Sequence, residues 1–391
     1  MNLSNLVITD PNEFSKVGDE VEAFIKEYGE FPFALPTFIK SVMNLKIHEN
    51  QVPVIIITKD REKIVGFASY VLRKIGISYG FSLLDYYGSV DLIIKDGYGQ
   101  VVATNLIKVT EKLGNIFTIM YFPAESSNLE YLRQACLANQ TSFFICSFPS
   151  ISHGVVPVLN SWNDFLKFRG RYFQKDLRAM ERKLDNEGSW RATLFESTNA
   201  ELDKNVLNNK IKAVDKSSWK GLSRQANGQT YDPVLSTYLE ASDPFDYKSI
   251  ATRKIWLLEL NNTPIAFSLI FKFKNIAFIA KTSFTEKYRK LSPGIFITNY
   301  AIRDLFQKKE VYKIDFMSTN SMVKFWDATI LPRYRIVFGK QIGVSALMAR
   351  QKFETITANL GHKQKLSLYD ATARERLTNR KPKIYSLFGI K

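Results

Sequence analysis

The chain has 391 residues, and a length of roughly 100–200 residues per domain predicts two domains. Hydrophobic residues make up 45% and charged residues 24%, proportions that exclude a chain disordered as a whole. Lysine and arginine outnumber the acidic residues by 54 to 38, and the net charge of +16 favours an anionic partner. A phosphate-rich cofactor, a nucleic acid and an anionic membrane surface all meet that description.

Helical and strand patterns alternate along the first part of the chain. Apolar residues recur at helical spacing in some segments and form β-branched runs in others. The predicted order is helix 10–28, helix 36–45, strands 52–58 and 63–72, helix 102–113, strand 117–122, helix 128–137 and strand 142–148. Gly154 and Pro157 then mark the clearest break. We therefore predict a first domain over residues 1–155.

The second predicted domain, residues 156–391, repeats this order. Its elements are helix 161–187, strand 190–196, helices 204–215 and 233–241, strands 255–260, 265–273 and 275–283, helix 294–308 and strand 311–317. Ser161 and Gly188 supply the N-cap and C-cap of the first, long helix. The repeated order predicts two similar α/β units with mostly antiparallel sheets, and a basic tail over 374–391 follows the second.

Neither the cysteines nor the histidines have the spacing of a metal site. Cys136 and Cys146 form no CxxC pair and no disulfide framework. His48, His153 and His362 match no ligand motif. The N-terminus lacks the pattern of a signal peptide, and no uninterrupted apolar stretch reaches the ~18 residues of a membrane span. We therefore expect a soluble, cytoplasmic protein without a metal ion.

A basic turn precedes the predicted helix 294–308. Its residues are Arg289, Lys290, Leu291, Ser292, Pro293 and Gly294. A helix N-terminus offers free backbone N–H groups and the positive end of the helix dipole, which together suit a pyrophosphate. Pro293 favours the first turn of a helix, and Gly294 would let a phosphate approach the backbone. The turn predicts a phosphate site, with an ordinary basic strand–helix connection as the alternative.

This turn resembles the pyrophosphate loop of the GNAT superfamily of CoA-dependent acyltransferases. That loop reads glutamine or arginine, two residues, glycine, one residue, then glycine or alanine; Arg289, Ser292 and Gly294 take these places, with Ser292 where the first glycine belongs. The resemblance implies acyl-CoA as co-substrate, bound by Arg289, Ser292, Pro293 and Gly294.

From about Pro32 to Trp326 the chain also resembles the CelD-like branch of GNAT proteins from bacterial polysaccharide clusters. The segments that carry this resemblance are Asp85–Gly88, Phe165–Gly188, Ser218–Gly221, Ser292–Gly294, Asp315–Phe316 and Lys324–Trp326. It implies a mixed α/β fold of two tandem GNAT-like domains. The same architecture is similar to that of Fem-type peptidyltransferases, whose acyl donor is an aminoacyl-tRNA.

Two residues at or after the predicted strand 311–317 are candidate catalytic groups. Lys324 follows a polar loop at the end of this strand, where functional residues gather, and the resemblance to Fem-type enzymes aligns it with a functional lysine. Its ammonium would stabilise charge in the transition state; a surface lysine beside Trp326 is the alternative. Asp315, inside the strand, is either a base for the nucleophile or the ion-pair partner of Lys324 or Arg289.

Candidate acceptor-binding residues lie in two places. Four cations of the long helix share a stripe about 60° wide: Arg171, Lys175, Arg178 and Arg182. Because like charges at this spacing repel, the stripe indicates an anionic partner, unless it is simply a solvated face. Trp219 and Lys220 precede the polar stretch 223–230, which we interpret as a lid. Trp219 either stacks on a substrate or anchors the core.

These patterns predict a transferase: a CoA-dependent N-acyltransferase that moves an acyl group to an amine or hydroxyl. The acceptor would be a small molecule or a polysaccharide precursor. The first alternative is a Fem-like aminoacyltransferase that uses aminoacyl-tRNA, for which the net charge of +16 is favourable. The second is a non-catalytic module that binds an anionic ligand or contacts a membrane surface peripherally.

Overall fold

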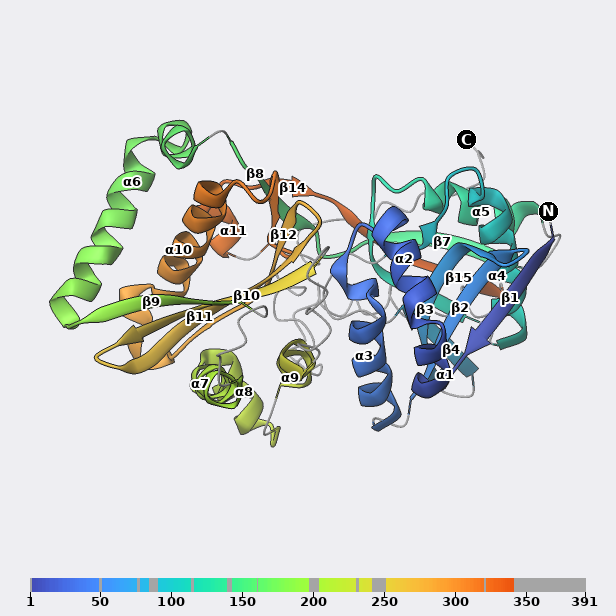
Figure 1. Ribbon diagram of the computed structural model, residues 1–391, viewed down its shortest axis with the longest axis horizontal. Helices are drawn as coiled ribbons and strands as arrows, with labels where there is room; N and C mark the ends of the chain where they lie inside the picture. The colour runs from blue at the N-terminus through green and yellow to red at the C-terminus, as the bar shows by residue number, and fades with distance from the viewer. Residues whose placement is uncertain are drawn as a thin grey trace, which may run out of the picture. The chain divides into compact units, whose positions relative to one another are not determined.

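The computed structural model describes residues 2–48, 51–75, 78–83, 91–113, 116–138, 143–159, 161–196, 204–229, 232–240, 251–319 and 321–340. The chain divides into a first unit, residues 1–152 with 331–391, and a second unit, residues 153–330. Each unit contains a sheet flanked by helices (Figure 1). The segment Asp85–Gly88 and the basic tail 374–391 lie outside the described residues.

The sheet of the first unit is mostly antiparallel. Its strands are β1 (Leu3–Ile8), β2 (Val52–Asp60), β3 (Lys63–Ile75), β4 (Ser78–Leu83), β5 (Ile93–Ile94), β6 (Ile116–Pro123), β7 (Phe143–Pro149) and β15 (Arg333–Lys340). They follow the order β1-β2-β3-β4-β6-β15-β7, and β5 pairs with β3. Strands β4 and β6 pair in parallel, in the register Gly80↔Ile116 to Ser82↔Thr118.

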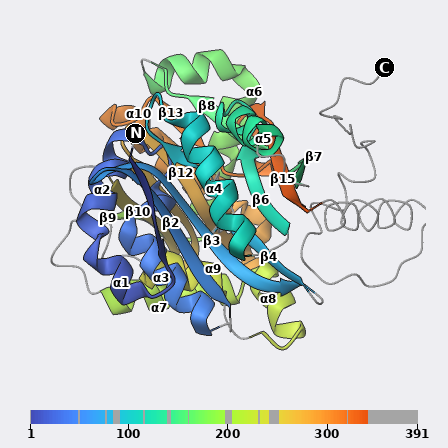
Figure 2. The ribbon, with the colours of Figure 1, turned by 90° about the vertical axis from the view of Figure 1, so that its right-hand side faces the viewer.

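Helices cover the sheet of the first unit. They are α1 (Pro11–Lys16), α2 (Gly18–Tyr28), α3 (Pro36–His48), α4 (Gly99–Leu113) and α5 (Asn128–Ala138), with a 3₁₀ turn over Pro32–Ala34. Helices α4 and α5 lie side by side (Figure 2) and share a core with Val54 and Ile56 of β2. Phe14 of α1 contacts Phe67 of β3. Alternate residues of the apolar strands are therefore buried by different helices.

The second unit repeats this plan. Its strands are β8 (His153–Pro157), β9 (Trp190–Glu196), β10 (Ala251–Leu260), β11 (Thr263–Phe273), β12 (Ile276–Phe284), β13 (Lys313–Asp315) and β14 (Thr329–Leu331). They follow the order β14-β8-β13-β12-β11-β10-β9. Strands β12 and β13 pair in parallel, like β4 and β6 in the first unit. Two mixed α/β units with mostly antiparallel sheets confirm the predicted fold class.

Two helical layers enclose the second sheet. The helices are α6 (Trp162–Glu187), α7 (Lys204–Lys216), α8 (Trp219–Ala226), α9 (Pro233–Glu240), α10 (Pro293–Lys308) and α11 (Ser321–Phe325), with a 3₁₀ helix η3 over Glu286–Leu291. Figure 1 shows α6 and α10 on one face and α7, α8 and α9 on the other. No helix in the described ranges is both long and apolar enough to cross a membrane.

Helix α6 is bent, although the sequence predicts one continuous helix. Its caps are as predicted: Asp164 N–H donates to Ser161 Oγ at the start, and Gly188 N–H donates to the Leu184 carbonyl at the end. The kink is at Gly170, where φ is +80° and ψ is −179°. Only glycine adopts such a conformation readily, which explains why the helix breaks at this residue.

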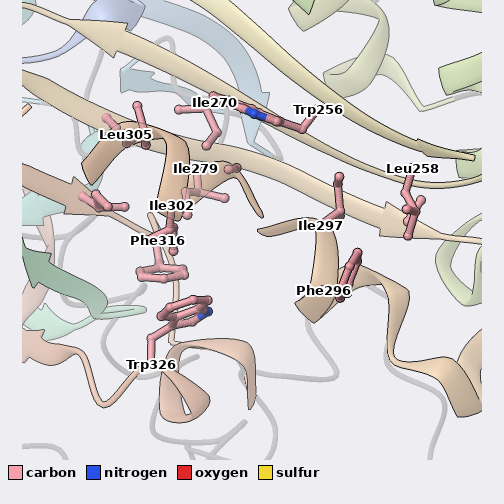
Figure 3. Packing of buried hydrophobic residues seen from close by; sticks show 14 of the residues in the cluster. Trp256, Leu258, Ile270, Ile279, Phe296, Ile297, Ile302, Leu305, Phe316 and Trp326 are labelled. Carbon is pink, nitrogen blue, oxygen red and sulfur yellow. The ribbon is translucent and has the colours of Figure 1, made fainter. Parts of the chain in front are cut away.

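An aromatic cluster fills the space between the sheet and the layer of α6 and α10. Trp326, which is 1% exposed, stacks on Phe165 of α6 and meets Phe173 of α6 edge-on. Figure 3 shows Trp326 beside Phe316, with residues of α10 packed towards the sheet. Aromatic pairs of this geometry add to the free energy of burial, so the cluster fixes α6 and the end of β13 relative to α10.

Two strands depart from the predicted domain organisation. Strand β8 forms within the predicted break and pairs with β13 in the second unit. Strand β15 lies in the predicted second domain, 156–391, but it pairs with β6 and β7 of the first unit. Both strands have partners far away in sequence, so local periodicity carries no sign of where they pair.

Candidate active site

Strand β12 separates from β13 in the middle of the second sheet. The two strands pair over three positions, Ile276↔Lys313, Ala277↔Ile314 and Phe278↔Asp315. Beyond Phe278, β12 continues to Phe284 along β11, while β13 ends. Within the described ranges, residues 279–284 of β12 therefore have no strand partner on the β13 side. A backbone edge of this kind can pair with an extended ligand.

A β-bulge lies at the start of this open edge. Ile279 pairs with Ile270 and Lys281 with Leu269, so Ala280 is the extra residue. The bulge shifts the alternation of the strand, and Lys281 and Ser283 both turn towards Asp215 of α7. Bulges often re-aim side chains next to active sites.

Lys281 belongs to a network of four charges, which we call the charge network: Asp215, Arg224, Asp232 and Lys281. Lys281 Nζ lies 3.0 Å from Asp215 Oδ1 and also contacts Asp232. Arg224 Nη1 lies 3.0 Å from Asp232 Oδ2, and its other terminal nitrogen contacts Asp215. The side chains of Asp215 and Lys281 are only 4% and 8% exposed. Buried ions in such numbers persist only when each one has partners.

The network changes the pKa of Asp232 and of a neighbouring lysine, Lys220. Burial opposes the charge of Asp232, but Lys281 and Arg224 outweigh it and lower the pKa of this carboxyl group. Protein atoms around the ammonium of Lys220, and then the positive charge of Lys281, lower the pKa of Lys220. Lys220 itself is exposed, and its ammonium lies 5.6 Å from the ring centre of Trp219, which is 50% exposed. Trp219 and Lys220, both predicted site residues, are therefore accessible to a ligand, and the charge network lies behind them.

The tight connection between α7 and α8 explains the sequence Ser218-Trp219-Lys220-Gly221. Ser218 Oγ accepts from the Gly221 N–H at 3.1 Å and donates to the Asp215 carbonyl at 2.6 Å. A Cβ on Gly221 would lie 2.1 Å from the Asp215 carbonyl oxygen. The absence of a side chain at Gly221 therefore lets α8 approach α7 and places Arg224 beside Asp215.

Gly221→Ala is expected to destabilise the protein by about 1–3 kcal/mol, since backbone must shift to admit the methyl group. Gly18 in α2 provides a control, because a Cβ added there would have its nearest neighbour 3.8 Å away. Gly18→Ala should be neutral or stabilise by up to about 1 kcal/mol. Urea unfolding of both variants measures the difference. Equal stability of the two variants would contradict the close packing of α7 and α8.

Asp315 has a buried partner that the sequence does not suggest. His153 Nδ1 lies 2.7 Å from Asp315 Oδ2, and the Met317 N–H donates to Asp315 Oδ1 at 2.6 Å. The expected pairing with Lys324 or Arg289 is wrong, because β8 brings His153 against β13. His153 is 4% exposed, and its Nε2 has no hydrogen-bond partner among the described residues. Dismissing the histidines on motif grounds therefore overlooked this pair.

The basic turn joins a left-handed residue to a helix start that has no side-chain cap. Ser292 adopts the left-handed conformation, with φ of +55°, between η3 and α10. Pro293 begins α10, and no side-chain hydrogen bond caps the helix. Arg289 is exposed and contacts Glu286 at 2.8 Å. Close packing also favours glycine at position 294, since a Cβ there would lie 3.0 Å from the Phe284 side chain of β12.

Lys324 and Asp315 come from the same stretch but do not approach each other as a pair. Lys324 is exposed in the last turn of α11, and no described residue forms an ion pair with it. Neighbouring Val323 and Trp326 belong to the core on the α10 face. Asp315 points to the opposite face, because Ile314 and Phe316 on either side of it join that same core.

The four cations of the stripe lie on the second segment of α6. Arg171, Lys175, Arg178 and Arg182 are all exposed. None of them forms an ion pair with an acidic side chain in the part of the chain that the structure describes. Arg178 also lines a cavity of about 140 Å³ between α6 and α10, together with Trp162, Asn299, Tyr300 and Arg303.

Residues 171–324 match the model of the acetyltransferase (GNAT) domain. This range contains the open edge of β12, the charge network and the basic turn. None of the curated proteins compared with the chain resembles it closely enough to count as a match.

Two solved structures share the fold over most of the chain. One is the C-terminal domain of a putative lysylphosphatidylglycerol synthetase from Agrobacterium fabrum, with 10% identity, a TM-score of 0.56, and coverage of 88% of this chain and 97% of that one. The other is FemX, with 10% identity, a TM-score of 0.55, and coverage of 85% and 96%. The family match thus lies within the second unit, and the two solved structures share the fold over most of the chain.

Proposed function

We propose that the chain is a cytoplasmic acyltransferase of the CelD-like GNAT branch that moves an acyl group from acyl-CoA to an amine or hydroxyl acceptor. The observation that carries this proposal is the separation of β12 from β13 beside the N-terminus of α10. An open strand edge suits the amide-containing arm of CoA, and a helix N-terminus suits its pyrophosphate.

The residues of the basic turn fit a pyrophosphate. Ser292 in the left-handed conformation leads directly into α10, whose first turn lacks a side-chain cap. Arg289 and Lys290 are exposed and add positive charge. When bound, acyl-CoA supplies an activated acyl group as a thioester. The residues proposed to hold it are Arg289, Ser292, Pro293 and Gly294.

The bulge of β12 and the network behind it support the chemical step. Backbone N–H groups near Ala280 would stabilise negative charge on the carbonyl oxygen. Asp315, held by His153, is the proposed proton acceptor, because a buried carboxylate with a histidine partner can store the proton of the nucleophile. Lys324 is proposed to stabilise transition-state charge. Trp219 and Lys220 of α8 would contact the acceptor, whereas the stripe, on the α6 face of the sheet, would contact a separate anionic part of a large acceptor.

A donor screen tests this proposal. Purified full-length protein is heated with acetyl-CoA, long-chain acyl-CoA, free CoA or tRNA, and the unfolding midpoint is recorded. A ligand that binds only the folded state raises stability by RT ln(1 + [L]/Kd), about 2.7 kcal/mol at a hundredfold excess over Kd. We expect CoA compounds to raise the midpoint. A response to tRNA with none to any CoA compound would reject CoA as the donor carrier, and binding without turnover would favour a non-catalytic module.

The aminoacyl-tRNA alternative has one specific observation in its favour. Four exposed cations on α6 lack acidic partners among the described residues, and a helix face of this kind suits a phosphate backbone. If tRNA carries the donor, neutralising Arg171, Lys175 and Arg178 should weaken tRNA binding and reduce its salt dependence. If the stripe binds an anionic acceptor instead, the same variant should raise the acceptor KM and leave kcat nearly unchanged.

A further inference from the structure

Two aromatic side chains stand in solvent on either side of the kink in α6. Phe168 is 72% exposed and Tyr172 is 85% exposed, more than any other large hydrophobic side chain in the described ranges. Phe165 and Phe173 of the same helix are buried against Trp326. The helix thus has a well-packed core face, and the exposed aromatics belong to a separate surface.

The kink that separates these aromatics is anchored to α11. Arg169 Nη1 lies 2.8 Å from Asp327 Oδ2, and Nη2 donates to the Phe325 carbonyl at 2.7 Å. The Arg169 guanidinium also lies 4.9 Å from the ring centre of Phe173. A fixed backbone holds Phe168 and Tyr172 outward, so little conformational entropy is lost when a partner covers them.

Basic residues are the charged neighbours of the two aromatics in the sequence between Asp164 and Asp176. Residues 165–175 contain four cations, Lys167, Arg169, Arg171 and Lys175, and no acidic residue. Arg169 is engaged by Asp327, whereas the other three are exposed and form no ion pair with any described residue. We call Lys167, Phe168, Arg171, Tyr172 and Lys175 the aromatic–basic patch.

We propose that the aromatic–basic patch docks the protein on an anionic membrane surface. A small anion would satisfy the cations but leave Phe168 in water, whereas unpaired bases of a nucleic acid would stack on the two rings. At a membrane interface, aromatic rings enter the headgroup region while lysine and arginine meet anionic lipids. A membrane surface accounts for both halves of the patch, and tRNA is the alternative that the experiment below tests. The proposal assigns Arg171 and Lys175, which also belong to the stripe, to lipid headgroups in place of tRNA.

Sedimentation with lipid vesicles tests the docking. Full-length protein is mixed with vesicles of one part phosphatidylglycerol to two parts phosphatidylcholine, or of phosphatidylcholine alone. We expect it to sediment with the anionic vesicles and to be released by salt. Phe168→Ser with Tyr172→Ser should lower the partition coefficient more than tenfold. Lys167→Gln with Arg171→Gln should lower it by roughly twentyfold, at about fivefold per charge.

Matched controls on other helices of the same unit distinguish binding through the patch from non-specific binding to vesicles. Val206→Ser with Leu222→Ser removes side chains that are 50% and 48% exposed, and Lys212→Gln with Lys216→Gln removes two charges of α7. Both pairs should leave the partition coefficient within about twofold. Equal sedimentation of patch variants and wild type would overturn the proposal. The proposal would also be overturned if the wild-type protein did not sediment with the anionic vesicles. The same holds if the patch variants lost tRNA binding and kept vesicle binding.

Discussion

Asp215→Ala is expected to lower the free energy of unfolding by about 3–5 kcal/mol, the cost of leaving buried charges without a partner. Asp215 contacts both Arg224 and Lys281, and it also accepts a hydrogen bond from Ser283 Oγ at 3.2 Å. Removing its carboxylate leaves two cations to share Asp232. Denaturant unfolding measures the loss, and a second variant, Asp215→Ala with Lys281→Met, should recover part of it because one unmatched charge is gone.

A surface pair provides the control for this experiment. Asp304 and Lys308 are one helical turn apart on α10, at 3.1 Å, with side chains 25% and 38% exposed. Asp304→Ala should cost less than about 1 kcal/mol, because water screens the pair. A loss of that small size for Asp215→Ala would contradict the view that the charge network holds α7, α8 and β12 together.

The network also predicts how stability responds to acid. The pKa of Asp232 is lowered in the folded protein, so the folded state favours its charged form. This contribution is fully present above the ordinary aspartate pKa of about 4 and is lost as the pH falls through the lower folded-state value. The stability difference between wild type and Asp232→Asn should therefore shrink as the pH decreases below about 4.

Lys324→Ala is expected to reduce kcat and kcat/KM together, by on the order of 10²–10³, with little change in donor affinity. This is the scale of one electrostatic group that acts mainly when charge develops in the transition state. Lys324 is exposed and forms no ion pair in the described part of the chain, so its removal should leave the unfolding midpoint unchanged. Steady-state kinetics with the donor and acceptor from the screen measure the effect.

Two comparisons give this kinetic test a clear outcome. Lys324→Arg keeps a positive charge and should retain more activity than Lys324→Ala. Lys212 is an exposed lysine of α7, and Lys212→Ala should leave every kinetic constant near the wild-type value. Unchanged kinetics in Lys324→Ala would show instead that Lys324 is a surface neighbour of Trp326.

Periodicity predicted the elements that bury one regular face. Strand β9, Trp190–Glu196, and helix α10, Pro293–Lys308, agree with their predicted bounds within a residue. Residues 223–226 of the predicted lid over 223–230 are the end of helix α8, because Ser218 caps that helix and Gly221 packs it against α7. The polar composition of this segment suggested a loop, but capping by Ser218 and packing at Gly221 extend helix α8 into it.

The candidate site was predictable only where backbone signals are local. A turn followed by a helix start can be predicted from the residue types of Ser292, Pro293 and Gly294 alone. The charge network was missed, because Asp215 and Lys281 lie far apart in the chain and the bulge at Ala280 changes which way Lys281 points. Lys281, which follows five apolar residues in β12, was the sequence signal that could have indicated a buried charge. The pairing of His153 with Asp315 depends on β8, whose place in the sheet no periodic pattern reveals.

The most direct test of CoA binding compares Ser292→Asp with Ser292→Asn by calorimetric titration of acetyl-CoA. Both side chains tolerate the left-handed backbone at φ +55°, and both can cap α10. Only aspartate places a negative charge where the pyrophosphate is proposed to bind. We expect Ser292→Asn to bind acetyl-CoA nearly as well as wild type, and Ser292→Asp to bind at least about tenfold more weakly while folding normally. Equal affinity of the two variants, or no binding by wild type, would contradict a CoA site at this turn.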